Sequence, residues 1–125
     1  MYRSAINNLF RCERATTAFE FALILPALAA LLVGGLYGAI AVYSSAGLHT
    51  AVEQAARCFS VNSTQCSDTS SAQNYAQSEY VGAGAPVFTA SLQSCGHQVS
   101  ATVTIPLYAV VVDFSVPLSA SACFP

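Results

Sequence analysis

The chain contains no lysine and no tryptophan, and charged residues occupy only 8% of its 125 positions. The chain has four arginines, and three of them precede Ala15: Arg3, Arg11 and Arg14. From Thr16 onward the sequence therefore contains one arginine, Arg57, and five acidic residues. A protein that binds nucleic acid needs clustered cationic side chains to contact the phosphates. We therefore exclude nucleic acid as a partner.

Charge is missing altogether from a long central run of the sequence. From Phe21 to Tyr43 there are 23 residues without a charged side chain. A helix needs about 20 apolar residues to cross a bilayer, so we predict one membrane span over residues 21–43. Because the arginines precede this span, the N-terminus is predicted to stay cytoplasmic and the C-terminal part to be exported. Single-pass insertion into a membrane, with lipid around the span, is the expected localisation.

The helical pattern continues beyond the predicted span. Past residue 44, apolar residues recur at spacings of three and four, which is typical of one buried helix face. These residues are Leu48, Val52, Ala55, Ala56 and Phe59. Glu53 and Arg57 have the spacing of an i,i+4 ion pair. We predict one helix over residues 16–60, in which residues 44–59 form an amphipathic extension.

Three residues within the span bear on how this helix packs. Pro26 lacks a backbone donor and predicts a kink or a locally loosened turn. Gly34 and Gly38 have the G-x-x-x-G spacing that allows two helices to approach closely in lipid. The same spacing is also compatible with a helix that has no partner, and the sequence leaves these two readings open.

The exported segment, residues 61–125, is small and contains most of the cysteines. Cys12 precedes the span, and four cysteines follow it: Cys58, Cys66, Cys95 and Cys123. Four exported cysteines in a small domain predict two disulfides, for which three connectivities exist. We favour Cys58–Cys66 and Cys95–Cys123, because each pair joins segments expected to be close in space.

The exported segment also carries the predicted sheet. Ala72–Val81 has a short helical pattern, with Ala72, Tyr75, Ala76 and Tyr80 toward the core, and Gly82–Pro86 ends it. Gln98–Ile105 and Phe114–Cys123 alternate between apolar and polar residues, as half-buried strands do, and Pro117 marks the second as an edge strand. Leu107–Val112 is apolar without a period and receives no assignment. The predicted fold is α+β: a long N-terminal transmembrane and amphipathic helix with a small antiparallel β head.

One carboxylate, Glu20, interrupts the start of the apolar run. It lies five residues after Ala15, the small residue that ends a basic leader over residues 1–15. A charged carboxylate at the end of a membrane span is costly in free energy, and it usually has a function and a polar partner. If the chain were cut between Ala15 and Thr16, the new amine and Glu20 would both lie near the membrane interface.

These residues resemble a known family. The run Ala15-Thr16-Thr17-Ala18-Phe19-Glu20-Phe21-Ala22-Leu23-Ile24-Leu25-Pro26 is similar to the N-terminal segment of TadE-like pseudopilins, minor components of the Tad (Flp) pilus. The stretch Ala55-Ala56-Arg57, the paired cysteines and the alternating Thr/Val strand resemble that family as well. The family usually has glycine before the cut, where this chain has Ala15.

The resemblance implies a pilin-like fold, a location in the bacterial inner membrane and a function in pilus assembly, and hence in surface adhesion. It implies cleavage after Ala15 by a membrane aspartyl prepilin peptidase, followed by N-methylation or a similar change at Thr16. In that family Glu20 is needed for processing or for pairing with a neighbour's terminal amine. The implied partners are the major pilin, sibling pseudopilins, the prepilin peptidase and the inner-membrane pilus platform.

No catalytic, metal-binding or cofactor-binding pattern accompanies these features. His49 and His97 are the only histidines, and Cys95-Gly96-His97 lacks the ligand number of a metal site. The sequence has no G-x-S-x-G motif and no paired carboxylates placed for acid–base catalysis. We therefore expect neither an enzyme nor a cofactor.

Two alternative functions remain compatible with the sequence. One is a secreted periplasmic domain behind an ordinary signal peptide, with Ala39-Ile40-Ala41 as the cleavage motif. The other is an uncut single-pass subunit of another envelope complex, with Gly34 and Gly38 facing its partner. The N-terminus of the mature protein distinguishes all three.

Overall fold

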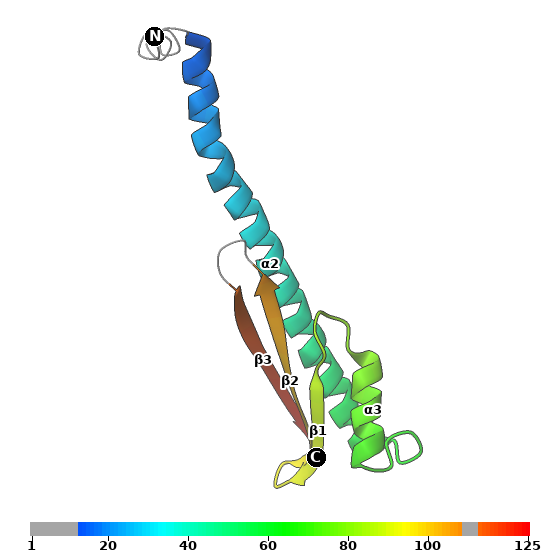
Figure 1. Cartoon of the computed structure of the whole chain (residues 1–125). Coiled ribbons are helices and arrows are strands. Elements are labelled where there is room, and N and C mark those ends of the chain that lie inside the picture. The colour runs from blue at the N-terminus through cyan, green and yellow to red at the C-terminus, as the bar shows by residue number, and fades with distance from the viewer. Residues whose placement is uncertain (1–12, 109–112) are drawn as a thin grey trace. The chain divides into compact units, whose positions relative to one another are not determined.

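The computed structural model describes residues 13–108 and 113–125. Its elements are helix α2 (Glu13–Val61), helix α3 (Thr69–Glu79) and strands β1 (Val87–Gln93), β2 (Gly96–Tyr108) and β3 (Asp113–Phe124), all labelled in Figure 1. The predicted α+β class is confirmed: a long N-terminal apolar helix is combined with a small three-stranded antiparallel sheet.

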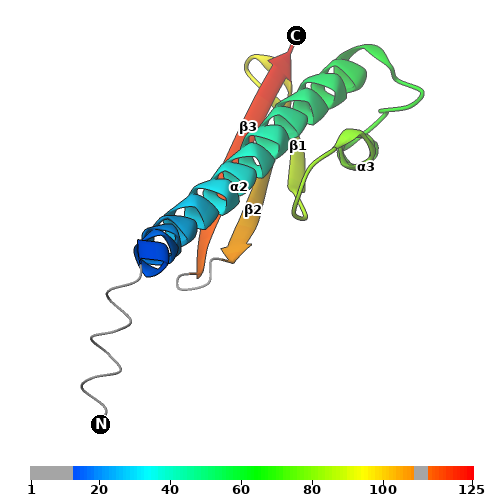
Figure 2. The same cartoon turned by 90° about the horizontal axis from the view of Figure 1, so that it is seen from above.

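The chain divides into two compact units between Leu36 and Tyr37, and helix α2 contributes to both. In the described part of the first unit, large apolar side chains of α2 are exposed all round the helix. Within the second unit, which runs from Tyr37 to Pro125, the sheet lies along the later turns of α2 and α3 lies next to β1 (Figures 1 and 2).

The sheet has the order β1-β2-β3, with antiparallel pairing throughout. Strands β1 and β2 form a tight hairpin in which Gln93 pairs with Gly96. Gly96 has a φ of +120°, which a side chain would strain, and a Cβ at this position would also overlap the Phe124 carbonyl oxygen. Glycine is therefore required at this corner of the sheet.

The core of the second unit lies between α2, α3 and the inner face of the sheet. Small and branched residues of α2 are fully buried in it, together with Ala76 of α3 and alternate residues of the strands. Its members are Leu48, Ala51, Val52, Ala55, Ala56, Ala76, Phe88, Val99, Ala101, Val103 and Ala120. Tyr75 and Tyr80 pack against this cluster, as predicted. The predicted helix face at Leu48, Val52, Ala55 and Ala56 is therefore the core face.

The opposite face of the sheet is rich in hydroxyl groups, and by the register Asp113, which pairs with Tyr108, is the one carboxylate on it among the described strand residues. Across the strands, Thr89 pairs with Ser100 and Ser100 with Ser121, while Thr102 pairs with Ser119. Thr102 and Thr104 are exposed, whereas their neighbours Val103 and Ile105 are buried. The strict alternation in β2 therefore separates a polar outer face from an apolar inner face.

Strand β2 extends beyond its partner β1, since the pairing with β1 ends at Thr102. From Val103 onward β2 pairs with β3 alone, and Pro106 lies in this stretch opposite Ser115. Pro117 lies opposite Thr104 in β3, which is an edge strand as predicted. Each proline thus occupies a strand segment with one free side, where a missing backbone donor is tolerated.

The element boundaries differ from the sequence-based predictions in several places, and α2 itself runs from Glu13 to Val61 where residues 16–60 were predicted. Strand β1 was not predicted at all, and β2 runs on to include Leu107 and Tyr108. The rest of the unassigned stretch, residues 109–112, lies outside the described residues, as do residues 1–12 of the leader. Helix α3 begins at Thr69 rather than at Ala72, because Asp68 caps it.

Candidate functional site

The proposed processing residues lie at the start of helix α2. Ala15 and Thr16 fall within its first turn, and Glu20 follows one turn later. Glu20 is exposed and is flanked by Phe19 and Phe21, whose side chains are 67% and 66% exposed. A carboxylate surrounded by exposed aromatic side chains is favourable only where a polar or cationic group meets it.

The residues after Glu20 form an apolar helical surface. In the part of the chain that the structure describes, one helical stretch, Thr17–Val61, is long and apolar enough to cross a membrane. Its most apolar window has a mean hydropathy of 2.2 and is not buried within the protein. This surface has the length and composition of a span, and its side chains are free to contact lipid or other helices.

Helix α2 continues through Pro26 and past the predicted packing glycines. A Cβ added at Gly34 would meet no heavy atom within 4 Å, and the same holds at Gly38. Both positions are therefore open on this chain, and their role in helix packing stays a prediction.

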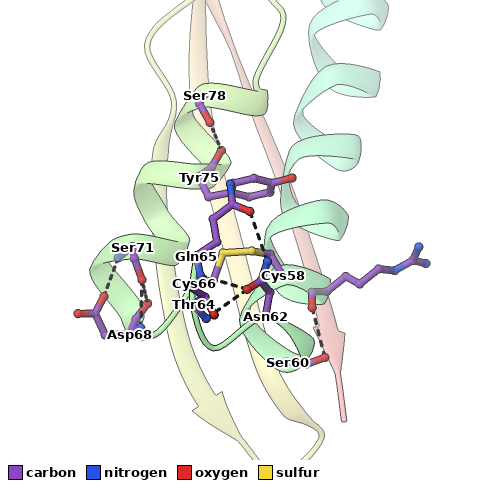
Figure 3. Close-up of a disulfide and its surroundings, with 11 residues drawn as sticks. Cys58, Ser60, Asn62, Thr64, Gln65, Cys66, Asp68, Ser71, Tyr75 and Ser78 are labelled. Atoms are coloured by element: carbon purple, nitrogen blue, oxygen red, sulfur yellow. Dashed lines mark hydrogen bonds between the residues drawn. A yellow bond between two sulfur atoms is a disulfide. The ribbon is translucent and has the colours of Figure 1, made fainter.

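The four cysteines that follow the predicted span form two disulfides in the structure. Cys58 is bonded to Cys66 and Cys95 to Cys123, which is the favoured connectivity. The first closes a short loop between α2 and α3 (Figure 3). The second ties the β1–β2 hairpin to the end of β3.

Polar contacts reinforce the loop that the first disulfide closes. The Asn62 side-chain oxygen accepts hydrogen bonds from the backbone N–H groups of Thr64 and Gln65, both at 3.1 Å (Figure 3). The backbone carbonyl of Asn62 accepts a further bond from the N–H of Cys66 at 3.0 Å. The turn is therefore fixed both by the covalent bond and by hydrogen bonds.

Helix α3 starts from a complete capping box at Asp68. The Asp68 carboxylate accepts a hydrogen bond from the Ser71 backbone N–H at 2.7 Å, and the Ser71 hydroxyl accepts one from the Asp68 N–H at 3.0 Å. The bond from the Ser71 N–H is the main cause that lowers the pKa of Asp68, and the hydroxyls of Ser71 and Ser70 lower it further.

The single cation of the second unit, Arg57, lies at the end of α2. Its guanidinium carbon is 5.3 Å from the centre of the Phe124 ring, over the ring. The predicted Glu53–Arg57 ion pair is wrong, because no ion pair joins these two described residues. The Phe124 ring, and not the Glu53 carboxylate, stabilises the Arg57 guanidinium.

Sequence reasoning missed a contact that fixes the segment after α3. The side-chain oxygen of Ser44, which is fully buried, accepts a hydrogen bond from the Ala83 N–H at 2.9 Å. The Tyr80 hydroxyl donates to the Ala83 carbonyl at 2.7 Å. One turn along α2, a Cβ at Gly47 would overlap the Val81 carbonyl oxygen. The sequence did contain a signal for this contact, because Ser44 and Gly47 lie one turn apart on an otherwise apolar helix face.

Neither histidine belongs to a ligand cluster in the residues described. Within residues 13–108 and 113–125, no group of three or more His, Cys, Asp or Glu side chains could hold a metal ion. His49 is exposed, and the ring of His97 meets the ring of Phe59 edge-on at 4.5 Å between centroids. The His97 ring therefore contributes to packing in this structure.

The arrangement defines a class of protein: one apolar helix near the N-terminus, continuous with a small disulfide-bonded domain, fits a single-pass membrane protein. Residues 15–57, about a third of the chain, match the model of the TadE-like protein family, so this segment is similar to that family. The match covers most of α2 and leaves α3 and the sheet outside it. No curated protein and no solved structure matches the chain.

Proposed function

We propose that this protein is a pseudopilin, or minor pilin, that takes part in the assembly of a Tad-type pilus. One observation carries the proposal: the family match over residues 15–57 coincides with a helix that exposes large apolar side chains and has one carboxylate, Glu20, near its start. The role is structural, since a helix of this kind acts by packing against lipid and other helices.

In the proposed pathway, the chain is inserted with its leader in the cytoplasm and its second unit outside the inner membrane. A prepilin peptidase cuts between Ala15 and Thr16, which frees an amine at Thr16. An unpaired amine and an unpaired carboxylate are both costly at the membrane interface. Glu20 of one subunit and the terminal amine of its neighbour offset each other and fix the axial register between subunits.

The remaining partners follow from the surface of α2. The exposed apolar side chains contact lipid before assembly and the helices of the major pilin or of sibling pseudopilins afterwards. The open positions at Gly34 and Gly38 support a close helix contact, because no group on this chain occupies the space beside them. The inner-membrane platform and the peptidase act on the chain before it joins a pilus, and the disulfide-bonded unit contributes to adhesion outside the cell.

The first experiment determines the N-terminus of the membrane-extracted protein by intact mass and terminal peptide sequencing. Wild type is expected to begin at Thr16. Glu20→Ala is expected to retain the leader or to fail in assembly, and Glu20→Gln is the matched variant that removes only the charge. Ala15→Gly restores the residue usual in the family and is expected to be processed at least as completely as wild type.

Two other results would contradict the proposal. A mature protein that begins near Val42 in the soluble fraction would identify a secreted domain. An intact Met1 in wild type, with Ala15→Gly also uncut, would identify an uncut membrane subunit of another complex.

A further inference from the structure

The predicted membrane span and the second unit share several turns of helix α2. Residues 21–36, which follow Glu20 and belong to the first unit, cover about 24 Å at about 1.5 Å per residue. The hydrocarbon core of a bilayer is about 30 Å thick, so these residues alone are too short to cross it. The turn that completes the span begins at Tyr37 and already belongs to the second unit. Lipid therefore reaches the second unit itself.

Contacts along α2 show which part of the sheet lies beside these turns. Near the end of α2, the ring of Phe59 meets the ring of His97 at 4.5 Å between centroids. Further back, the segment 82–84 lies between Ser44 and Val103. A Cβ at its first glycine would be 3.0 Å from the Ser44 Cα, and one at its last glycine would be 2.8 Å from the Val103 Cγ2. Strand β2 therefore runs antiparallel to α2, with its later residues beside earlier turns of the helix (Figure 1).

The end of the β2–β3 hairpin lies at the level where lipid meets the second unit. From His97 to Leu107 the strand advances about 33 Å, which equals the length of about 22 residues of helix. Counted back along α2 from Phe59, this distance places Leu107 at the level of Tyr37. Tyr37 and Ile40 are half-buried and lie three residues apart, as expected where the sheet covers one side of the helix.

The apolar inner face of the sheet is not fully covered at this end. Leu107 pairs with Phe114 across β2 and β3, so both side chains lie on the inner face. Leu107 is buried, whereas Phe114 is 52% exposed. The next residue along, Asp113, is exposed and falls on the outer face. An exposed aromatic ring next to a carboxylate is suited to the boundary between lipid headgroups and acyl chains, where one side is apolar and the other is wet.

We propose that the end of the β2–β3 hairpin lies in the membrane interface, where lipid acyl chains cover the Phe114 ring. The Asp113 carboxylate stays among the headgroups and limits the depth, because a charge in the hydrocarbon core is costly. Helix α2 and the hairpin then hold the second unit against the membrane at two points. The inference rests on membrane insertion of α2 and not on the pilus role.

The absence of tryptophan from the chain allows a direct test, because one introduced indole is then the only one present. The full-length protein is reconstituted into phosphatidylcholine vesicles, with and without bromine atoms on the upper part of the acyl chains. Bromine quenches tryptophan emission at contact distance. In the brominated vesicles, the Phe114→Trp variant is expected to lose about half of its emission or more.

Two matched variants calibrate the measurement. Leu92→Trp replaces a residue that is 69% exposed near the opposite end of the sheet, where Leu92 pairs with His97. It is expected to lose less than about a tenth of its emission, because it lies about 33 Å from the hairpin end. Leu31→Trp lies within the span and is expected to be quenched by bromine placed deeper in the acyl chains. The tyrosine circular dichroism of each variant reports whether the second unit is folded.

Two results would overturn the proposal. If Phe114→Trp keeps its emission as Leu92→Trp does, while Leu31→Trp is quenched, the hairpin end lies outside the bilayer. If the emission of Phe114→Trp does not respond to bromine but shifts to shorter wavelength as the ratio of protein to lipid is raised, a second copy of the chain covers the ring instead of lipid. N-terminal processing is measured independently of position 114, so either proposal can fail without the other.

Discussion

The two ends of helix α2 have the same backbone geometry and opposite surroundings. Near the start, Leu28 and Leu31 are 54% and 74% exposed, whereas Leu48 is completely buried. The early turns carry Phe, Leu and Ile on every side, while the buried turns use alanine where the sheet and α3 pack, as at Ala51, Ala55 and Ala56. Where partners within the chain cover one side of the helix, small residues allow close packing, and charged residues occupy the other side. Where lipid or other helices surround it, apolar residues of any size are accepted.

The comparison predicts that chemically equal substitutions have unequal effects in the two units. The free energy of unfolding of the second unit reports the difference, and it can be followed in detergent micelles by the circular dichroism of its tyrosines.

The largest effect is expected from the disulfides, which belong only to the second unit. Replacement of Cys95 and Cys123 by serine is expected to lower its stability by about 3.5 kcal/mol, and the same change at Cys58 and Cys66 by about 2.5 kcal/mol. The sequence separations are 28 and 8 residues, and a bond that closes the longer loop restricts the unfolded chain more. Urea denaturation measures both values, and a larger loss from the shorter loop would contradict the argument.

The next effect comes from the same truncation made in each half of α2. Leu48→Ala leaves a cavity in the core and is expected to cost about 3 kcal/mol. Leu28→Ala removes an exposed side chain and is expected to change the stability of the second unit by less than about 0.5 kcal/mol. Equal losses would show that the second unit depends on the early turns of the helix.

Glycine to alanine substitution should change sign between the two units. Gly47→Ala forces a methyl group into the Val81 carbonyl and is expected to destabilise the second unit by about 2 kcal/mol. At Gly34 the added methyl meets no atom of this chain, so helix content is expected to rise slightly. Urea denaturation and far-ultraviolet circular dichroism separate the two outcomes.

The smallest expected effect is a dependence on acid at the start of α3. The pKa of Asp68 is lowered in the folded state from its ordinary value of 3.8, so its contribution to stability is present above that value and is lost as the pH falls through the folded pKa. Asp68→Asn keeps a capping side chain that does not titrate, and it is expected to remove this part of the acid sensitivity. Asp113→Asn removes an exposed carboxylate that caps no helix and serves as the control in the same pH series.

Much of this fold is predictable from the sequence, because its patterns are strong where one side of an element is buried. The alternation from Val99 to Ile105 identified β2, and the spacing of the buried residues of α2 identified its core face. Strand β1 was missed because Val87 and Leu92 are exposed while Ala90 and Ser91 are half-buried, so its residues do not alternate cleanly in polarity.

Contacts between distant segments could not be predicted in the same way. Arg57 has a suitable partner four residues away in Glu53, yet it lies over Phe124, because the fold brings the end of β3 beside the end of α2. The bond between Ser44 and Ala83 joins residues 39 positions apart and has no local pattern. For the processing residues, the sequence supplied the identities of Ala15, Thr16 and Glu20, and their roles stay predictions until the mature N-terminus is known.

The two prolines of the sheet have a consequence for how these proteins meet at high local concentration. Strands with free sides can recruit strands from other molecules, and among the described strand residues the outer face of this sheet has a single charge, Asp113, to discourage such pairing. Pro106 breaks the row of backbone N–H donors on β2 in the segment that does not pair with β1. Pro117 breaks the row of backbone N–H donors on β3. Each proline therefore removes one N–H donor from a strand segment with a free side, which disfavours growth of the sheet from molecule to molecule at these two segments.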